Sequence, residues 1–314
     1  MSSNRWVADA TLLSVAIVWG LTFVIIQDAV AILPPFAFNA ARFGVAAILL
    51  ALYLYFQLRS AEKIKNLAKH ITYGIILGAL LFAGYALQTY SLLYTSSGKS
   101  GFLTGLSVAL VPFLSFFILR SRPTFSAMLG TFFAVIGLYL MAFSDLSSIN
   151  RGDFLAFICA IAFGLQLVYT AKFTKEVSTA LLVFVQLITV AILNTGATIL
   201  FEKPVSINLF FEISVFWALI ITSLFATVFA FIAQTYFIKF TSPARVALIF
   251  ATEPVFAAIG DFAWNEILLG PITLIGCLFI LVGMILAEIP ISKSFLPDFK
   301  KNQKDTLLKN PGES

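Results

Sequence analysis

Apolar stretches of about 20 residues follow one another along the whole chain, and short polar segments separate them. A stretch of about 18 or more residues with few charges is long enough to cross a bilayer as an α-helix. The separating segments are rich in Pro, Gly, Ser and Asn, as in Leu33-Pro34-Pro35. The pattern predicts an all-α polytopic membrane protein with ten transmembrane helices, at residues 9–31, 36–57, 71–93, 100–119, 125–143, 153–171, 179–200, 213–237, 244–264 and 270–289.

Motifs of the first half recur in the second half at a constant distance of 146 positions. The recurring pairs are Gln88-Thr89-Tyr90 with Gln234-Thr235-Tyr236, Thr95-Ser96 with Thr241-Ser242, Gly130 with Gly276, and Gly137 with Gly283. A fixed offset over roughly fifty residues indicates a duplicated unit. We therefore expect two five-helix repeats, residues 9–143 and 153–289, followed by a polar cytoplasmic tail at 290–314. Because five is odd, the second repeat is expected to be inverted, an arrangement typical of transporters with a substrate site between the repeats.

The Lys and Arg residues are distributed unevenly between the two sets of loops. Of the 20 in the chain, 16 fall on the side that holds both termini. Only Lys99, Arg151 and Lys203 fall on the other side, and Arg42 lies within a span. Cytoplasmic loops carry the excess of positive residues. We therefore expect an integral protein of the bacterial inner (plasma) membrane with both termini cytoplasmic.

The composition agrees with this pattern and limits the chemistry. The chain is 60% hydrophobic and 11% charged, against about 25% charged residues in soluble domains. The two cysteines, Cys159 and Cys277, lie inside apolar spans, so we expect no disulfide framework. His70 is the only histidine, and the acidic residues are scattered singly. We therefore expect no enzyme activity, no cofactor, no metal site and no nucleic-acid partner.

Polar side chains inside the predicted spans are the candidate substrate-binding residues, because a polar group in lipid needs either a partner or a function. Gln88 and Gln234 occupy equivalent places, and their amides both donate and accept hydrogen bonds. Arg42 can neutralise a substrate carboxylate, extend to the headgroups or make a structural pair. For the other residues, the alternative is helix packing and interhelical hydrogen bonding. The candidate set is Trp19, Thr22, Asn39, Arg42, Tyr85, Gln88, Gln166, Tyr169 and Gln234.

Glu253 is the candidate coupling residue. It lies about nine residues into its span, or about 14 Å at 1.5 Å per residue. The adjacent Pro254 removes a backbone hydrogen bond and can kink the helix. Glu253 can bind a coupling proton or neutralise a cationic substrate group. The alternative is a carboxylate that fixes helix packing.

Lys99 and Arg245 begin spans four and nine at equivalent positions. With inverted repeats they lie at opposite membrane faces. They can therefore control the two entrances electrostatically, or anchor their helices at the surface.

Three pairs of segments resemble the EamA family. The stretch Tyr94–Gly105, followed by Leu110-Val111-Pro112, is similar to the first EamA repeat. The stretch Thr241–Phe250, leading to Glu253-Pro254-Val255-Phe256, is similar to the second, and Trp19-Gly20 and Phe163-Gly164 also fit. The resemblance implies the drug/metabolite transporter superfamily, with ten spans, an inverted duplication and alternating access to a central cavity. Members of that superfamily export or exchange amino acids, metabolites and drugs.

From the repeat, the charge pattern and the resemblance we expect a secondary transporter, an exporter or exchanger of small metabolites such as amino acids. Its partners are a small-molecule substrate, the lipid bilayer and, through Glu253, a coupling proton. One alternative is a nucleotide-sugar or phosphate-ester exchanger of the same superfamily, which needs a more basic cavity. The others are a non-transporting membrane receptor and a membrane enzyme.

Overall fold

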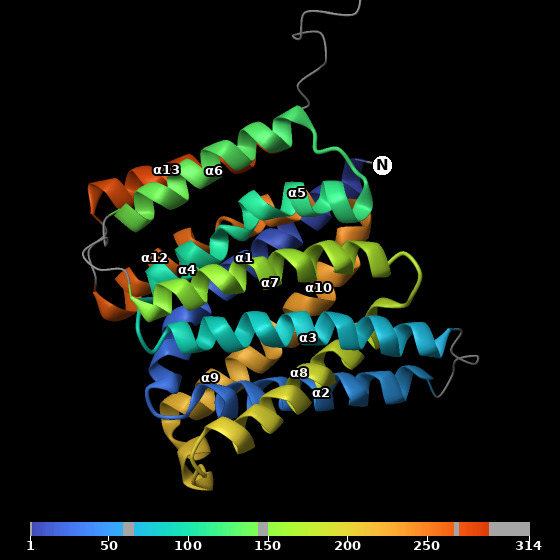
Figure 1. The fold of residues 1–314 in the computed structure, drawn as a ribbon, viewed down its shortest axis with the longest axis vertical. Helices are drawn as coiled ribbons and strands as arrows, with labels where there is room; N and C mark the ends of the chain where they lie inside the picture. The colour runs from blue at the N-terminus through green and yellow to red at the C-terminus, as the bar shows by residue number, and fades with distance from the viewer. Residues whose placement is uncertain (1, 59–65, 144–149, 267–269, 289–314) are drawn as a thin grey trace, which may run out of the picture.

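The computed structural model describes residues 2–58, 66–143, 150–266 and 270–288, which form a bundle of helices with no strand among them (Figure 1). Eight helical segments are long and apolar enough to cross a membrane, and two shorter apolar helices cover Phe125–Met141 and Pro271–Ala287. The predicted all-α membrane fold is therefore confirmed, and each of the ten predicted segments is helical. The predicted tail at 290–314 lies outside the described residues.

Most helix starts follow from local sequence signals. Helices α2, α11 and α13 each begin with a proline. Proline is favoured at the first position of a helix because the N–H that it lacks would make no hydrogen bond within the helix there. Ser96 and Ser242 cap α4 and α11. The helices are α1 (Ser2–Val30), α2 (Pro35–Leu58), α3 (Leu67–Ser91), α4 (Ser97–Gly105), α5 (Ser107–Leu119), α6 (Phe125–Phe143), α7 (Arg151–Phe173), α8 (Thr179–Phe201), α9 (Ile213–Ser223), α10 (Ala230–Phe237), α11 (Pro243–Phe250), α12 (Glu253–Asn265) and α13 (Pro271–Glu288).

Three of the predicted spans are not continuous α-helices. Span four consists of α4 and α5 with a break at Leu106, and span nine consists of α11 and α12 with a break at Ala251 and Thr252. The breaks lie at equivalent positions, because Leu106 and Thr252 are 146 positions apart. In span nine the cause is Pro254, which has no N–H to donate to the carbonyl of Phe250. Span eight contains a π-helical segment, η2 (Leu224–Phe229), between α9 and α10.

The two halves of the chain pack against each other along their equivalent helices. Helices α6 and α13 lie side by side at one edge of the bundle, and α2 packs against α8 (Figure 1). Glycines allow the first contact: a β-carbon added at Gly137 would lie 2.5 Å from the backbone oxygen of Gly276. The first span of each half packs against the broken span of the other half, since α1 contacts α11 and α12 while α7 contacts α4 and α5.

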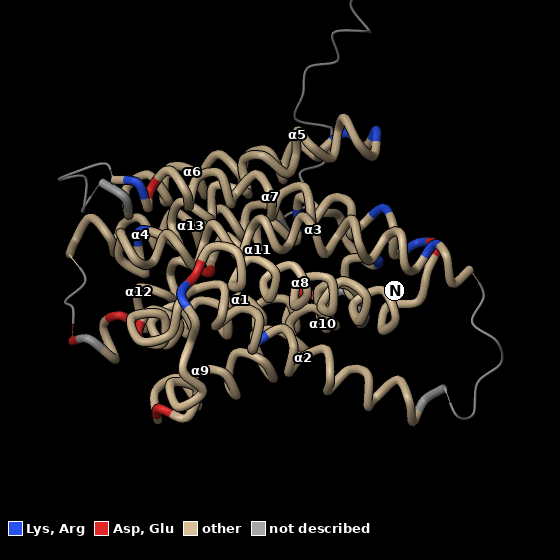
Figure 2. Tube along the Cα trace, turned by 60° about the horizontal axis from the view of Figure 1, so that its bottom comes forward, with Lys and Arg blue, Asp and Glu red and all other residues tan. Residues whose placement is uncertain are grey.

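Charged residues lie mostly near the two ends of the bundle, and long uncharged stretches of helix connect those ends (Figure 2). This distribution is expected of helices whose middle thirds face hydrocarbon. The few charged residues inside the bundle are therefore the ones that need an explanation.

Candidate functional site

A cavity lies between helices of both halves. Its walls come from α1, α2, α3, α7, α10 and the broken spans four and nine. Discontinuous helices at equivalent positions of two repeats commonly line the substrate site of a transporter. The predicted residues that line the cavity are Trp19, Thr22, Arg42, Tyr85, Gln88, Gln166, Gln234 and Glu253.

Two predicted residues, Asn39 and Tyr169, do not line this cavity. Asn39 is fully buried, and its Nδ2 donates to Oγ1 of Thr89 at 3.0 Å, which ties α2 to α3. Tyr169 packs against Phe173 with ring centroids 5.5 Å apart. Gln166 therefore lines the cavity, whereas Tyr169 packs into the neighbouring core.

Arg42 lies deep inside the bundle with 1% of its surface exposed, so its guanidinium is not at the headgroups. Its Nε donates to Oγ1 of Thr227 at 2.8 Å, and its Nη2 donates to the carbonyl of Ala226 at 3.2 Å. The guanidinium also lies 4.8 Å from the ring centroid of Tyr85. No carboxylate of the described residues forms an ion pair with it. The positive charge is therefore held by neutral acceptors and an aromatic face.

The π-helical segment is the element that Arg42 contacts. The indole Nε1 of Trp19 also donates to the carbonyl of Ala226, at 2.8 Å. Thr227 donates in turn to the carbonyl of Thr222, five residues earlier, at 2.8 Å. Short π-helical segments often occur at functional sites. Here the segment connects two cavity residues, Trp19 and Arg42, to the helix that carries Gln234.

The glutamines bind each other or a neighbouring hydroxyl across the bundle. Nε2 of Gln234 donates to Oε1 of Gln166 at 3.1 Å, and Nε2 of Gln88 donates to Oγ1 of Thr104 at 3.3 Å. Nε2 of Gln166 is buried, and none of the described residues accepts a hydrogen bond from it. An unsatisfied buried donor is costly, so this amide is available to an acceptor inside the cavity.

Glu253 is the first residue of α12, immediately after the break in span nine, and it is half-buried. A β-carbon added at Gly20 would lie 2.5 Å from the backbone oxygen of Glu253. Glycine at this position therefore lets α1 touch the first turn of α12. The carboxylate forms no hydrogen bond or ion pair with any residue in the described ranges. The predicted kink is thus a break, and the side chain faces the cavity without a partner.

Some cavity residues were missed by sequence reasoning. Thr104 contacts both Gln88 and Sγ of Cys159, and it lies two residues before the break at Leu106. The sequence signal that could have identified Thr104 is its position between Gly101 and Gly105. Phe250 packs edge-to-face on Trp19 at 4.9 Å between centroids. No signal distinguishes it, because the chain contains 34 phenylalanines.

Within the described ranges, no group of three or more His, Cys, Asp or Glu side chains is arranged to hold a metal ion. Among the described residues that line the cavity, one carries a carboxylate and one a guanidinium. Its chemistry is therefore that of charge pairing, amide hydrogen bonding and aromatic contact.

Comparison with known sequences gives two consecutive matches to one family model, described as the EamA-like transporter family, over residues 6–143 and 150–288. An uncharacterized transporter of Archaeoglobus fulgidus is 29% identical over 92% of this chain and 88% of its own length. The uncharacterized transporter YyaM of Bacillus subtilis is 27% identical over 88% of this chain and 92% of its own length.

Comparison with solved structures finds the same fold. One chain, described only as a crystal structure of a protein, superposes with a TM-score of 0.73. The superposition covers 90% of this chain and 96% of that chain, at 18% sequence identity.

Proposed function

This chain belongs to the EamA-like transporter family, and from that premise we propose that it carries amino acids or similar zwitterions across the membrane by alternating access. Membership in the family and the uncharacterized transporters among its relatives support a membrane transporter. The substrate class is our inference from the cavity.

The observation that carries the proposal is one basic and one acidic side chain in the same cavity that form no ion pair with each other. Arg42 and Glu253 both line the cavity, and neither forms an ion pair with the other or with another described residue. A buried charge without a partner is costly in a low-dielectric site. A zwitterion satisfies both charges at once, with its carboxylate toward Arg42 and its ammonium toward Glu253. The free amide of Gln166 supplies a further donor.

The same arrangement suggests how transport is coupled. A carboxylate that binds either an ammonium group or a proton exchanges one for the other. We therefore propose that Glu253 releases its proton when substrate binds, which makes the carrier a substrate/proton antiporter. The other titratable groups near it are the phenol of Tyr85, the thiol of Cys159 and the guanidinium of Arg42. These keep their protons near neutral pH by their ordinary chemistry, which leaves Glu253 as the proton carrier.

The nucleotide-sugar or phosphate-ester alternative is less favoured by the cavity. Phosphates are bound by several cations together. Among the described residues that line the cavity, Arg42 is the one Lys or Arg, while Lys99 and Arg245 pair with carboxylates elsewhere.

In the proposed orientation, the protein lies in a bacterial inner membrane with both termini in the cytoplasm. The second repeat is inverted relative to the first. The excess of Lys and Arg on one side supports this orientation. The proposed direction is efflux or exchange, in line with the superfamily that the sequence resembles.

Counterflow in proteoliposomes tests the substrate class. We expect saturable counterflow with at least one neutral amino acid and none with nucleotide sugars or sugar phosphates. Counterflow with the phosphorylated compounds alone would overturn the proposal.

Glu253→Gln is expected to abolish stimulation of transport by a pH gradient, because the amide cannot carry a proton at this site. Counterflow without a gradient should persist at reduced affinity, by about tenfold for the loss of one charged contact. The measurement is substrate flux with and without an imposed gradient, in the same vesicles.

Asp28→Asn is the matched control, since Asp28 accepts a hydrogen bond from the exposed Trp264 at 3.2 Å and does not line the cavity. Its pH response should equal that of the unsubstituted protein. An unchanged pH response in Glu253→Gln would exclude Glu253 as the coupling group.

A further inference from the structure

Two ion pairs join the halves of the molecule in a reciprocal way. Nζ of Lys99 in α4 lies 2.8 Å from Oδ2 of Asp153 in α7, and Nη2 of Arg245 in α11 lies 2.6 Å from Oδ2 of Asp9 in α1. In each pair, the broken span of one half supplies the cation and the first span of the other half supplies the carboxylate. If the two halves of the chain are exchanged, each ion pair therefore takes the place of the other.

The sequence offsets support this equivalence. Lys99 and Arg245 are 146 positions apart, and Asp9 and Asp153 are 144 apart. The second offset is also the one that relates Trp19-Gly20 to Phe163-Gly164 in the same helices. The local structure agrees, because the backbone N–H of each cation donates to a capping serine, Ser96 or Ser242, at 3.3 Å.

The two pairs lie at opposite ends of the bundle. Lys99 and Asp153 stand in the first turns of α4 and α7, at the end where α1 and α3 finish. Asp9 and Arg245 lie toward the starts of α1 and α11, at the other end. The cavity, with Gln88, Gln166 and Glu253, lies in the spans between them.

Helix geometry alone does not favour these cations. Both stand in the first turn of a helix, where the positive end of the helix dipole repels a positive charge. Partial burial adds a desolvation cost, because the side chains of Lys99 and Asp153 are 8% and 7% exposed. Both cations therefore stand at equivalent positions where a positive charge is unfavourable. This indicates that the ion pairs have a role beyond anchoring the helices at a surface.

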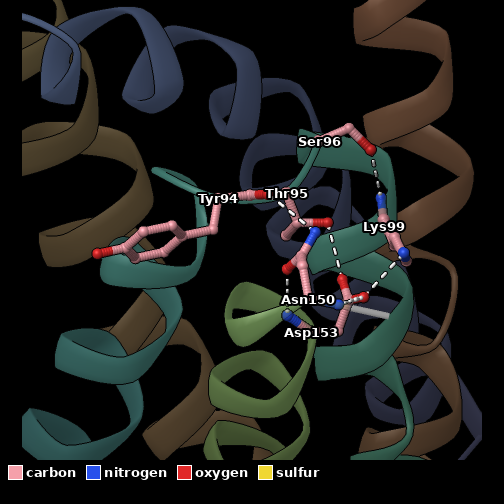
Figure 3. Close-up of polar contacts among 6 residues, drawn as sticks. All are labelled: Tyr94, Thr95, Ser96, Lys99, Asn150 and Asp153. Atoms are coloured by element: carbon pink, nitrogen blue, oxygen red, sulfur yellow. Dashed lines mark hydrogen bonds and ion pairs between the residues drawn. The ribbon is translucent and has the colours of Figure 1, made fainter. Parts of the chain in front are cut away.

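The pairs differ in strength. Asp153 also accepts from Oγ1 of Thr95 at 2.9 Å and from the backbone N–H of Asn150 at 2.9 Å, as Figure 3 shows. The side chains of Arg245 and Asp9 are more exposed, at 22% and 13%. The α4–α7 pair is therefore the more firmly held of the two.

We propose that the α4–α7 and α1–α11 ion pairs are the two gates of the carrier, each closing one end of the cavity, and that they open in alternation. Opening one end requires the first span of one half to separate from the broken span of the other, and this separation breaks the ion pair at that end. The inference rests on the alternating access of the proposed function, but it does not depend on the substrate.

The test is accessibility of the cavity from each side. Thr22→Cys, in a background with Cys159→Ala and Cys277→Ala, places one thiol in the cavity. A membrane-impermeant maleimide is then applied to vesicles of known orientation, from either side. Asp153→Asn is expected to raise labelling from the α4–α7 end, and Asp9→Asn from the α1–α11 end, each by about fivefold or more, the lower range of allosteric coupling.

Three further variants separate gating from folding. Asp9→Arg combined with Arg245→Asp restores opposite charges and should return labelling to the starting level, because Asp9 has no other hydrogen bond among the described residues. Glu176→Gln removes the exposed ion pair with Lys69, whose side chains are 51% and 42% exposed, and should change nothing. Should Asp153→Asn fail to fold, Lys99→Gln opens the same gate.

Opposite shifts in the two single variants support the gates even if amino acids are not carried. Equal shifts from both sides, no shift in either variant, or no restoration by the charge exchange would overturn the inference.

Discussion

Arg42→Ala is expected to lower amino-acid counterflow by about 100-fold, the cost of removing one partner of a buried charged contact. The substitution removes the cation proposed to bind the substrate carboxylate. It also removes the bonds to Thr227 and Ala226, so the π-helical segment keeps the bond from Trp19 but loses both bonds from Arg42. Arg42→Lys keeps the charge but cannot make both bonds with the geometry of a guanidinium. We expect it to retain partial transport.

Thr227→Val separates the two roles of Arg42, which are to bind the substrate carboxylate and to hold the π-helical segment. It removes the 2.8 Å bond to Nε while leaving the charge in the cavity. Stability should fall, as measured by thermal unfolding in detergent, while the preference for zwitterions should persist. If Arg42→Ala transports with unchanged affinity, Arg42 is a packing residue and the proposed binding mode is wrong.

Gly137→Leu is expected to prevent recovery of a folded monomer. Even a single β-carbon at this position would lie 2.5 Å from the backbone oxygen of Gly276 and 2.8 Å from Cγ1 of Ile280. Overpacking by a few carbons already costs about 1–3 kcal/mol, and contact with backbone cannot be relieved by a rotamer change. The α6–α13 contact, which joins the two halves, must therefore open. The measurement is size-exclusion chromatography and thermal unfolding of the purified protein.

Gly44→Leu is the matched control, because a β-carbon at Gly44 in α2 meets nothing within 4 Å. It should elute and unfold like the unsubstituted protein. Equal behaviour of the two leucine variants would contradict the close α6–α13 contact.

The helices could be predicted because their apolar stretches are long and sharply bounded. The second span was expected at 36–57 and is observed as Pro35–Leu58, since Pro34 and Pro35 set its start. The equivalence of Gly137 and Gly283 was visible as a fixed offset. The packing of Gly137 onto Gly276 and of Gly283 onto Gly130 could not be predicted, because periodicity does not say which helix covers which face.

The cavity was partly predictable for a related reason. A polar residue in an apolar span is conspicuous, and Gln88, Gln166 and Gln234 all face the cavity. Whether such a residue meets a ligand or a neighbour depends on packing, which placed Asn39 against Thr89 instead. The π-helical segment has no proline or glycine to mark it. It depends on contacts from Trp19 and Arg42, about 200 positions away in sequence.

The most direct test of the central claim compares three compounds that share one side chain. The first compound is the amino acid with the highest counterflow. The second is the amine with the same side chain but no carboxylate, and the third is the carboxylic acid with the same side chain but no ammonium group. If Arg42 and Glu253 bind opposite ends of a zwitterion, each analogue should compete about 100-fold more weakly than the amino acid. If the amine or the acid competes as well as the amino acid, the paired-charge account of this cavity is contradicted.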